Sequence, residues 1–183
     1  MGSRQTDWPR EWLMTDERMG ERLWEAIGRL PHDRGGIVFR HYGLPRDRRE
    51  ILAGRIAEIC RRRGLTLAIA RDVDLARWFG ARLVHNPAEP VADLPFSRAV
   101  HSIEEARAAG AEGAALVFVS PVRPTRSHPG QEPLGRTSAA RIARAAGVPA
   151  IALGGMDSTA YLGMRDAFHG WAGIDAWLWD SPE

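Results

Sequence analysis

Several residues that could bind an anion stand directly after short apolar runs of the sequence. Gly154 and Gly155 follow one such run, and glycines let backbone N–H groups approach a phosphate beside a helix N-terminus. The competing interpretation is a tight turn that needs positive φ angles. Arg40 ends another run, and a guanidinium at the end of a buried strand needs an anionic partner. A substrate phosphate and the neighbouring carboxylate Asp16 are the two candidates for that partner.

Two histidines also follow predicted strands. His101 has the side chain whose ordinary pKa lies near 6.5, so it could move a proton at working pH. Its alternative role is to cap the next helix or to pack in the mouth of the barrel. His85 could contact a ligand in the same region. The six histidines show no metal-ligand spacing, and Cys60 is the only cysteine, so the residues by themselves predict no metal site.

A proline-rich loop over residues 120–130 carries many hydrogen-bond donors. Arg123 or Arg126 could give bidentate contacts to an anion, and Thr125 and His128 add further donors. Loops of this length in a compact chain are usually functional, although an ordinary surface loop is the alternative. We therefore expect this loop to close over an anionic ligand.

Composition narrows the class of protein. The chain has 183 residues, 44% of them hydrophobic and 26% charged, with a net charge of +2, which is typical of a soluble globular protein. All 25 cationic side chains are arginine, which excludes enzymes that need a lysine amine, such as Schiff-base aldolases and P-loop NTPases. The single cysteine fits a reducing cytoplasm. No run is long enough to span a membrane, and the scattered, acid-paired cations argue against nucleic-acid binding.

The elements that would position these residues alternate between strand and helix. Apolar runs predict strands at 12–14, 36–40, 65–70, 81–85, 97–101, 114–119, 148–153 and 173–177. Helical patterns lie between them, at 16–30, 46–63, 72–79, 134–146 and 158–167, with another helix through Glu104 and Ala108. Eight units of about 23 residues are short for a closed eight-stranded barrel, which usually needs about 250 residues. We predict an α/β fold in one domain over residues 1–183, a compact TIM (β/α)8 barrel with short helices after the fourth and eighth strands.

Motifs along residues 12–177 resemble one family of such barrels. They are Trp12-Leu13-Met14-Thr15-Asp16, Phe39-Arg40, Asp72-Val73-Asp74-Leu75-Ala76, Val84-His85, Val100-His101-Ser102, Pro121-Val122-Arg123-Pro124-Thr125 and Leu153-Gly154-Gly155-Met156. In this order they resemble the thiamine-phosphate synthase and TenI (aminothiazole tautomerase) superfamily. The resemblance implies a TIM barrel in thiamine biosynthesis or salvage.

The resemblance also implies roles for single residues. Synthases of the family join a pyrimidine pyrophosphate to a thiazole phosphate with the help of Mg²⁺. Carried over by position, Arg40 would touch the pyrophosphate, His85 would lie near the pyrimidine, and Thr125 would serve the anion site. Gly154 and Gly155 would hold the thiazole phosphate through their backbone N–H groups.

Several family positions hold different residues here. Ala70-Arg71 replaces the Asn-Asp pair whose aspartate ligates Mg²⁺, and only Glu89 could replace the second metal carboxylate. The remaining departures are Tyr42 and His128 at lysine positions, Ala99 at a serine position, and Asp175 in the serine region after the eighth strand. An arginine at the metal site repels Mg²⁺, but Arg71 could instead bind a pyrophosphate directly.

Three functions remain open at this point. The leading prediction is a TenI-like tautomerase without a cofactor, in which His101 is the acid/base and the Gly154-Gly155 pair holds a thiazole phosphate. One alternative is a thiamine-phosphate synthase with Mg²⁺ and a site rebuilt around Arg71 and Glu89. The other is a non-catalytic ligand-binding barrel. All three predict a small phosphorylated thiazole or pyrimidine as partner, and seven tryptophans indicate a possible homo-oligomer.

Overall fold

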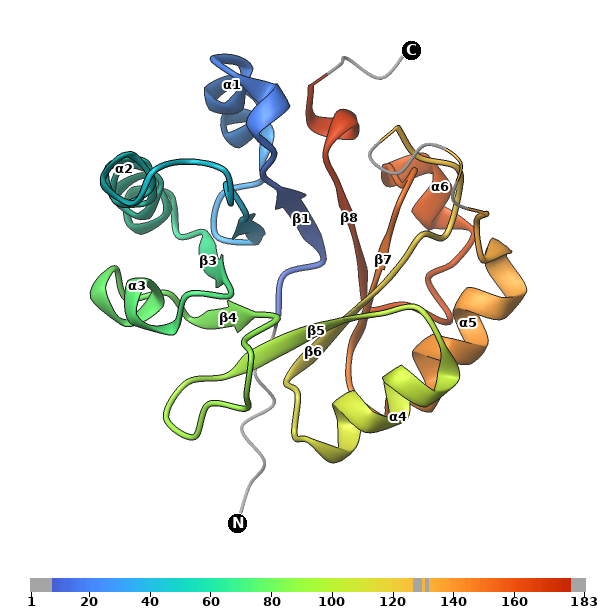
Figure 1. Ribbon diagram of the computed structural model, residues 1–183. Coiled ribbons are helices and arrows are strands. Elements are labelled where there is room, and N and C mark those ends of the chain that lie inside the picture. The colour runs from blue at the N-terminus through green and yellow to red at the C-terminus, as the bar shows by residue number, and fades with distance from the viewer. Residues whose placement is uncertain (1–7, 127–129, 131, 179–183) are drawn as a thin grey trace.

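The strands form a closed parallel barrel, which confirms the predicted fold. The computed structural model describes residues 8–126, 130 and 132–178 (Figure 1). Each strand pairs with the next along the chain, and the last pairs with the first. The strands are β1 (Glu11–Met14), β2 (Gly35–Phe39), β3 (Thr66–Ala70), β4 (Leu83–His85), β5 (Phe96–Val100), β6 (Leu116–Val119), β7 (Ala150–Leu153) and β8 (Gly170–Gly173).

Helices surround this barrel on the outside, as Figure 1 shows. They are α1 (Arg22–Arg29), α2 (Arg46–Arg63), α3 (Val73–Trp78), α4 (Ile103–Ala111), α5 (Gly135–Ala145) and α6 (Ser158–Leu162), with the 3-10 helices η1 (Glu17–Met19) and η2 (Asp175–Trp177). The chain runs from β4 to β5 without a helix, and only η2 follows β8 in the described part. Within the described residues, the connections after β4 and β8 therefore lack a full helix, and these are the two places where the sequence predicts short helices.

Three element boundaries differ from the sequence-based expectation. The eighth strand lies at Gly170–Gly173, and the segment predicted as that strand turns into η2. Gly170 lies so close to the Arg10 carbonyl that a Cβ there would overlap it, so the closing strand needs glycine where the pattern favours larger residues. The helix expected over 16–30 is divided at Gly20, whose φ is 51°, and α6 ends at Leu162.

Aromatic side chains fill the barrel interior. Trp12 on β1 meets Phe118 on β6 edge to face, with ring centroids 5.6 Å apart. Gly36 leaves room for this indole, because a Cβ at Gly36 would overlap the Trp12 ring. The indole nitrogen of Trp12 donates to the Pro9 carbonyl at 2.7 Å. The interior is therefore a packed core, and the space for a ligand lies at one end of it.

Polar caps fix the starts of the helices at the carboxyl ends of the strands. The carboxylates of Asp72 and Asp157 and the hydroxyl of Ser102 accept from backbone N–H groups in the first turns of α3, α6 and α4. At the other end of α2, Gly64 takes a left-handed conformation with φ of 64°. These caps set where each strand-to-helix loop leaves the barrel.

No helix in the described ranges is long and apolar enough to cross a membrane.

Candidate functional site

Strand pairing decides which side chains face the barrel interior. Trp12 faces inward, and it pairs in register with Gly36 of β2 and Ala172 of β8. Side chains alternate along a strand, and paired residues of neighbouring strands share a face. Following this register around the barrel places polar residues on the inward face at or just after the carboxyl ends of their strands, among them Asp16, Arg40, His85 and His101. They define the mouth of the barrel, where parallel barrels carry their chemistry.

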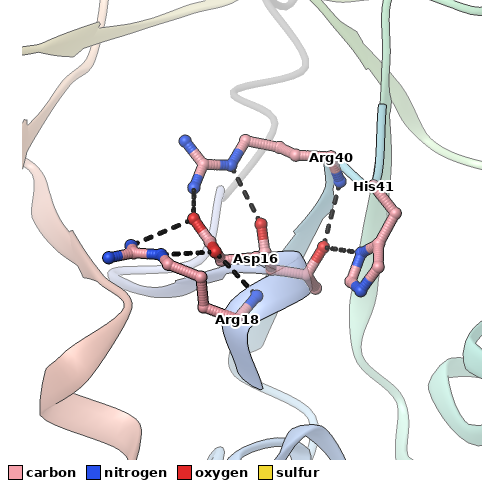
Figure 2. A network of polar contacts seen from close by, with 5 residues as sticks. Asp16, Arg18, Arg40 and His41 are labelled. Carbon is pink, nitrogen blue, oxygen red and sulfur yellow. Dashed lines mark hydrogen bonds and ion pairs between the residues drawn. The ribbon is translucent and has the colours of Figure 1, made fainter. Parts of the chain in front are cut away.

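Arg40 is held firmly at this mouth (Figure 2). Its Nε donates to the Thr15 carbonyl at 3.0 Å, and its backbone N–H donates to the Thr15 hydroxyl at 3.0 Å. Its Nη2 reaches Asp16 only at 3.5 Å, while the side chain is 20% exposed. Burial lowers the pKa of Arg40, although Tyr42 and then Asp16 act electrostatically in the opposite direction. The structure thus contains the carboxylate partner, but at a distance that leaves the guanidinium poorly compensated.

Asp16 is shared between two arginines. Its Oδ1 accepts from Nε of Arg18 at 2.8 Å, and its Oδ2 accepts from Nη2 of Arg18 at 3.1 Å, closer than the contact with Arg40. Arg18 lowers the pKa of Asp16 through these hydrogen bonds and its charge, which outweigh the burial that alone would raise it. Beside this network, Nδ1 of His41 lies 3.0 Å from the Thr15 hydroxyl (Figure 2). Arg18 therefore carries most of the pairing with Asp16.

His85 forms part of the floor of the mouth. The residue is 4% exposed, its Nδ1 lies 3.0 Å from the Ser97 hydroxyl, and its ring meets that of Phe118 edge to face, with centroids 5.1 Å apart. Burial, followed by the charges of Arg40, Arg71 and Arg98, lowers the pKa of His85 to about 3. The imidazole is therefore neutral at physiological pH, and burial leaves little of its surface to meet a ligand.

His101 lies at the mouth with an exposed ring. Its Nδ1 is 2.7 Å from the Ser120 carbonyl. Because a carbonyl oxygen only accepts, Nδ1 carries the proton of the neutral ring and Nε2 keeps its lone pair. Ser102, rather than His101, caps α4, and Glu105 accepts from the His101 backbone N–H at 2.6 Å. This excludes capping as the role of the ring.

The paired glycines lie against the loop that follows β6. Gly154 and Gly155 both have positive φ, 92° and 59°. A Cβ on Gly154 would stand 2.8 Å from the Cα of Pro121, and the Gly154 carbonyl accepts from the Arg123 N–H at 3.1 Å. The turn and the close approach thus both require glycine here. The phosphate-binding role stays a prediction.

Nothing within the described residues accepts from the Gly155 N–H, so this amide is available to a ligand. The α6 helix adds little to it, because α6 has five residues and the Asp157 carboxylate already occupies its first turn. Thr125 is half-buried and Arg126 is exposed in the neighbouring loop, and His128 lies outside the described residues. Backbone contacts bring the loop and the glycines together, whereas those donors remain candidates.

Arg71 stands on the rim between β3 and α3. Its side chain is exposed, and its guanidinium lies over the ring of Tyr42, 4.6 Å from the centroid. Its φ of 66° is uncommon for a residue with a side chain. The Arg71 N–H donates to the His85 carbonyl at 2.8 Å, which ties this rim residue to the floor of the mouth.

The donor set does not suit the Mg²⁺ that the resemblance implies. Among the residues that the structure describes, no three His, Cys, Asp or Glu side chains gather closely enough to hold a metal ion. Glu89 is exposed in the connection from β4 to β5, and Asp16 is occupied by Arg18. A guanidinium, that of Arg71, replaces the expected carboxylate. Mg²⁺ prefers several oxygen ligands, so these residues do not fit it.

Sequence reasoning did not identify Ser97 and Arg49. Ser97 sits opposite His85 only through the register between β4 and β5, which local sequence does not reveal. Arg49 is an early residue of α2 and resembles a solvated helix cation. Its guanidinium nevertheless donates to the carbonyls of His41 and Ala70 and to Asp72 at 2.9–3.0 Å. It fastens the loops after β2 and β3 to each other.

Similarity to known proteins agrees with this architecture. The family model described as thiamine monophosphate synthase matches residues 13–175. A thiamine-phosphate synthase of Geobacillus thermodenitrificans is 31% identical over 173 residues and covers 78% of each chain. The putative thiamine-phosphate synthase 2 of Aquifex aeolicus is 26% identical over 182 residues, with 93% of this chain and 98% of that relative covered. Against the bifunctional thiamine biosynthesis protein ThiM/ThiE of Symbiobacterium thermophilum the identity is 36% over 131 residues, and the match spans only 27% of that protein.

Solved structures show the same barrel. A thiamine phosphate pyrophosphorylase from Pyrococcus furiosus superposes with a TM-score of 0.78 at 21% identity, over 91% of this chain and 86% of that one. FabK from Thermotoga maritima also superposes, with a TM-score of 0.70 at 15% identity, over 94% of this chain and 59% of that one. At these identities the likeness concerns the fold alone, and function depends on the site.

Proposed function

Since the chain belongs to the thiamine monophosphate synthase family, we propose that it is a transferase of the thiamine-phosphate synthase type, which joins a thiazole phosphate to a pyrimidine diphosphate. The naming of its relatives supports this function over the tautomerase that the sequence motifs favour. The observation that carries the proposal is Arg40, a fixed and poorly compensated cation facing the mouth. A buried guanidinium in that state favours an anionic ligand.

The reaction breaks a carbon–oxygen bond and forms a carbon–nitrogen bond. The bonding electron pair leaves with the diphosphate, and the lone pair of the thiazole nitrogen closes on the resulting pyrimidine cation. Negative charge grows on the diphosphate as it departs, so a cation placed there lowers the barrier. Arg40 supplies this positive charge, and the hydrogen bond to the Thr15 carbonyl holds its Nε in position before the reaction begins.

Two other parts of the mouth have supporting roles in this proposal. The N–H of Gly155 donates to the thiazole phosphate, which anchors the nucleophile near the β6 loop. The His85 ring stays uncharged, so it adds no repulsion to the pyrimidine cation that forms above it. A neutral floor thus leaves the developing positive charge to be balanced by the departing diphosphate.

The test is product formation from the two substrates. The purified chain is incubated with thiazole phosphate and pyrimidine diphosphate, and thiamine phosphate and released diphosphate are quantified by chromatography. We expect equimolar products, and a loss of 100-fold or more in kcat/KM in Arg40→Ala. An exposed arginine of α4, changed in Arg107→Ala, is the matched control and should leave turnover unchanged. Saturable binding of both substrates without any product would favour a non-catalytic binding barrel instead.

A TenI-type tautomerase remains a second candidate because of His101. Its Nδ1 is held by the Ser120 carbonyl, so Nε2 is free to take a proton at the open mouth. That reaction needs a phosphate grip and a proton shuttle, and no metal. Thiazole phosphate isomerisation followed by NMR distinguishes the two activities. Turnover of the single substrate that drops at least 100-fold in His101→Ala supports the tautomerase, whereas turnover that persists in this variant removes it.

A further inference from the structure

A shallow pocket on the rim separates the loops that follow β2 and β3. It encloses about 470 Å³ and is lined by Tyr42, Arg46, Arg49, Ala70, Arg71, Asp72, Val73 and Asp74. The pocket adjoins the mouth, because Phe39 pairs in register with Ile69, and Arg40 and Ala70 are the next residues of these two neighbouring strands. Arg71 follows directly. Neighbouring strands lie about 4.8 Å apart, and Arg71 is the residue after the one that stands opposite Arg40.

Most charges of this pocket are already paired. Arg46 binds Glu50 at 2.8 Å, and Arg49 binds Asp72 at 2.9 Å. The other carboxylate, Asp74, lies 3.3 Å from Arg77.

Arg71 is the exception. Within the described ranges it has no carboxylate at ion-pair distance, and its recorded side-chain contact is the Tyr42 ring. The pocket therefore presents one uncompensated guanidinium at its edge.

The position of Arg71 is set by its backbone. The left-handed φ of 66° costs roughly 1 kcal/mol for a residue with a Cβ, and the N–H bond to the His85 carbonyl holds that conformation. The ring of Tyr42 then supports one face of the guanidinium, and no side-chain hydrogen bond from Arg71 is found among the described residues. A planar guanidinium donates two parallel hydrogen bonds to a phosphate, and it stays charged at any physiological pH.

The effect of Arg71 reaches the mouth electrostatically. After burial, the charges of Arg40 and Arg71 are the next two causes that depress the pKa of His85. Both cations therefore act on the same buried ring from the β2 and β3 side. An anion bound to either guanidinium would weaken this effect on the pKa of His85.

We propose that Arg71, standing over Tyr42 on the rim of the barrel, binds the diphosphate group of the substrate directly, so that this member of the family needs no divalent metal there. This inference rests on the proposed transferase function for the identity of the ligand. The positive charge that binds the phosphates would then come from a side chain and not from a metal ion. A metal bridges carboxylates to phosphates, whereas here the carboxylates of the pocket, Asp72 and Asp74, are paired with arginines, and the guanidinium of Arg71 would meet the phosphates.

Calorimetric titration with inorganic diphosphate tests the proposal without turnover. We expect saturable binding in EDTA that is as tight as, or tighter than, binding in MgCl₂. Arg71→Asn removes the guanidinium with a residue that tolerates the left-handed backbone, and should weaken binding at least 10-fold in both buffers. The matched control is Arg107→Ala, which removes an exposed arginine of α4 outside the pocket and should change affinity less than 3-fold. Circular dichroism of each variant checks folding.

Each outcome bears on the proposal. Binding that needs Mg²⁺, or binding that is equal in Arg71→Asn and the parent protein, overturns it. If Arg71→Asn loses affinity for diphosphate but the parent protein forms no thiamine phosphate, the anion site is supported and the transferase function is refuted. If thiamine phosphate forms in EDTA and Arg71→Asn does not reduce its rate of formation, the transferase function is supported and the role of Arg71 is refuted.

Discussion

Replacing Arg40 with methionine should weaken ligand binding far more than folding. The methionine keeps most of the apolar stem and removes two interactions, the Nε bond to the Thr15 carbonyl at 3.0 Å and the contact with Asp16 at 3.5 Å. Asp16 keeps its hydrogen bonds from the Arg18 side chain at 2.8 and 3.1 Å, so no buried carboxylate is left unpaired. The backbone N–H of residue 40 still donates to the Thr15 hydroxyl.

The magnitudes follow from these contacts. One hydrogen bond contributes about 1 kcal/mol and a long ion pair less than about 1 kcal/mol, while the lost cost of burying the guanidinium offsets part of both. We therefore expect the free energy of unfolding in Arg40→Met to change by no more than about 1.5 kcal/mol. Removing one partner of a desolvated charge pair in a complex costs about 2–5 kcal/mol, which is a loss of about 30-fold or more in affinity.

Urea unfolding measures the first quantity, and calorimetric titration with inorganic diphosphate measures the second. Arg107→Met, on the exposed face of α4, is the control for loss of one positive charge. The reasoning is refuted if Arg40→Met loses more than about 3 kcal/mol of stability while the folded variant binds diphosphate as the parent does. Arg40 would then be a structural residue and the mouth would need another anion ligand.

Three further predictions concern stability and reactivity. The pKa of His85 is about 3 when folded and near 6.5 when unfolded, so the unfolded chain binds the extra proton and stability falls as the pH drops from 6.5 towards 3. The slope reaches about 1.4 kcal/mol per pH unit, and urea unfolding should show a shallower dependence in His85→Asn. Gly154→Ala should lower the free energy of unfolding by about 2 kcal/mol or more, because the φ of Gly154 is 92° and the new Cβ would overlap Pro121. The control is Gly147→Ala, where φ is 65° and the surrounding space is open, and it should cost about 1 kcal/mol. Thermal melts measure both losses, and equal losses would contradict the packing argument. Burial raises the pKa of Cys60 to about 12, so the native protein should not react with iodoacetamide at pH 8, and rapid alkylation would show that the thiol is accessible.

Local sequence predicted the features that depend on near neighbours. The apolar run at Leu116–Val119 became a buried strand, and Asp157 became a helix cap. The amphipathic segment at 46–63 formed α2 with Gly64 as its left-handed end, as expected. Spacing, caps and glycines act over a few residues, so a single chain segment contains the information that sets them.

Local patterns were less able to place the eighth strand. The expected strand at 173–177 begins three residues after the observed start at Gly170, because the Gly170–Gly173 segment by itself has only a weak strand pattern. It is stabilised by pairing with β1 and β7 on both sides and by the close approach of the Arg10 carbonyl. Barrel closure is a non-local constraint, and it overrode the local preference.

The sequence by itself determined the order of the units, the anion-binding chemistry that arginines make available, and the glycines that the turn after β7 requires. Only the tertiary structure decided how those charges pair. In the structure Asp16 pairs mainly with Arg18, and its ion pair with Arg40 is long. The guanidinium of Arg71 lies over the Tyr42 ring and has no carboxylate partner among the described residues. The physical reason is that charge compensation depends on distances between different strands, which the register and closure of the barrel fix and which no local pattern encodes.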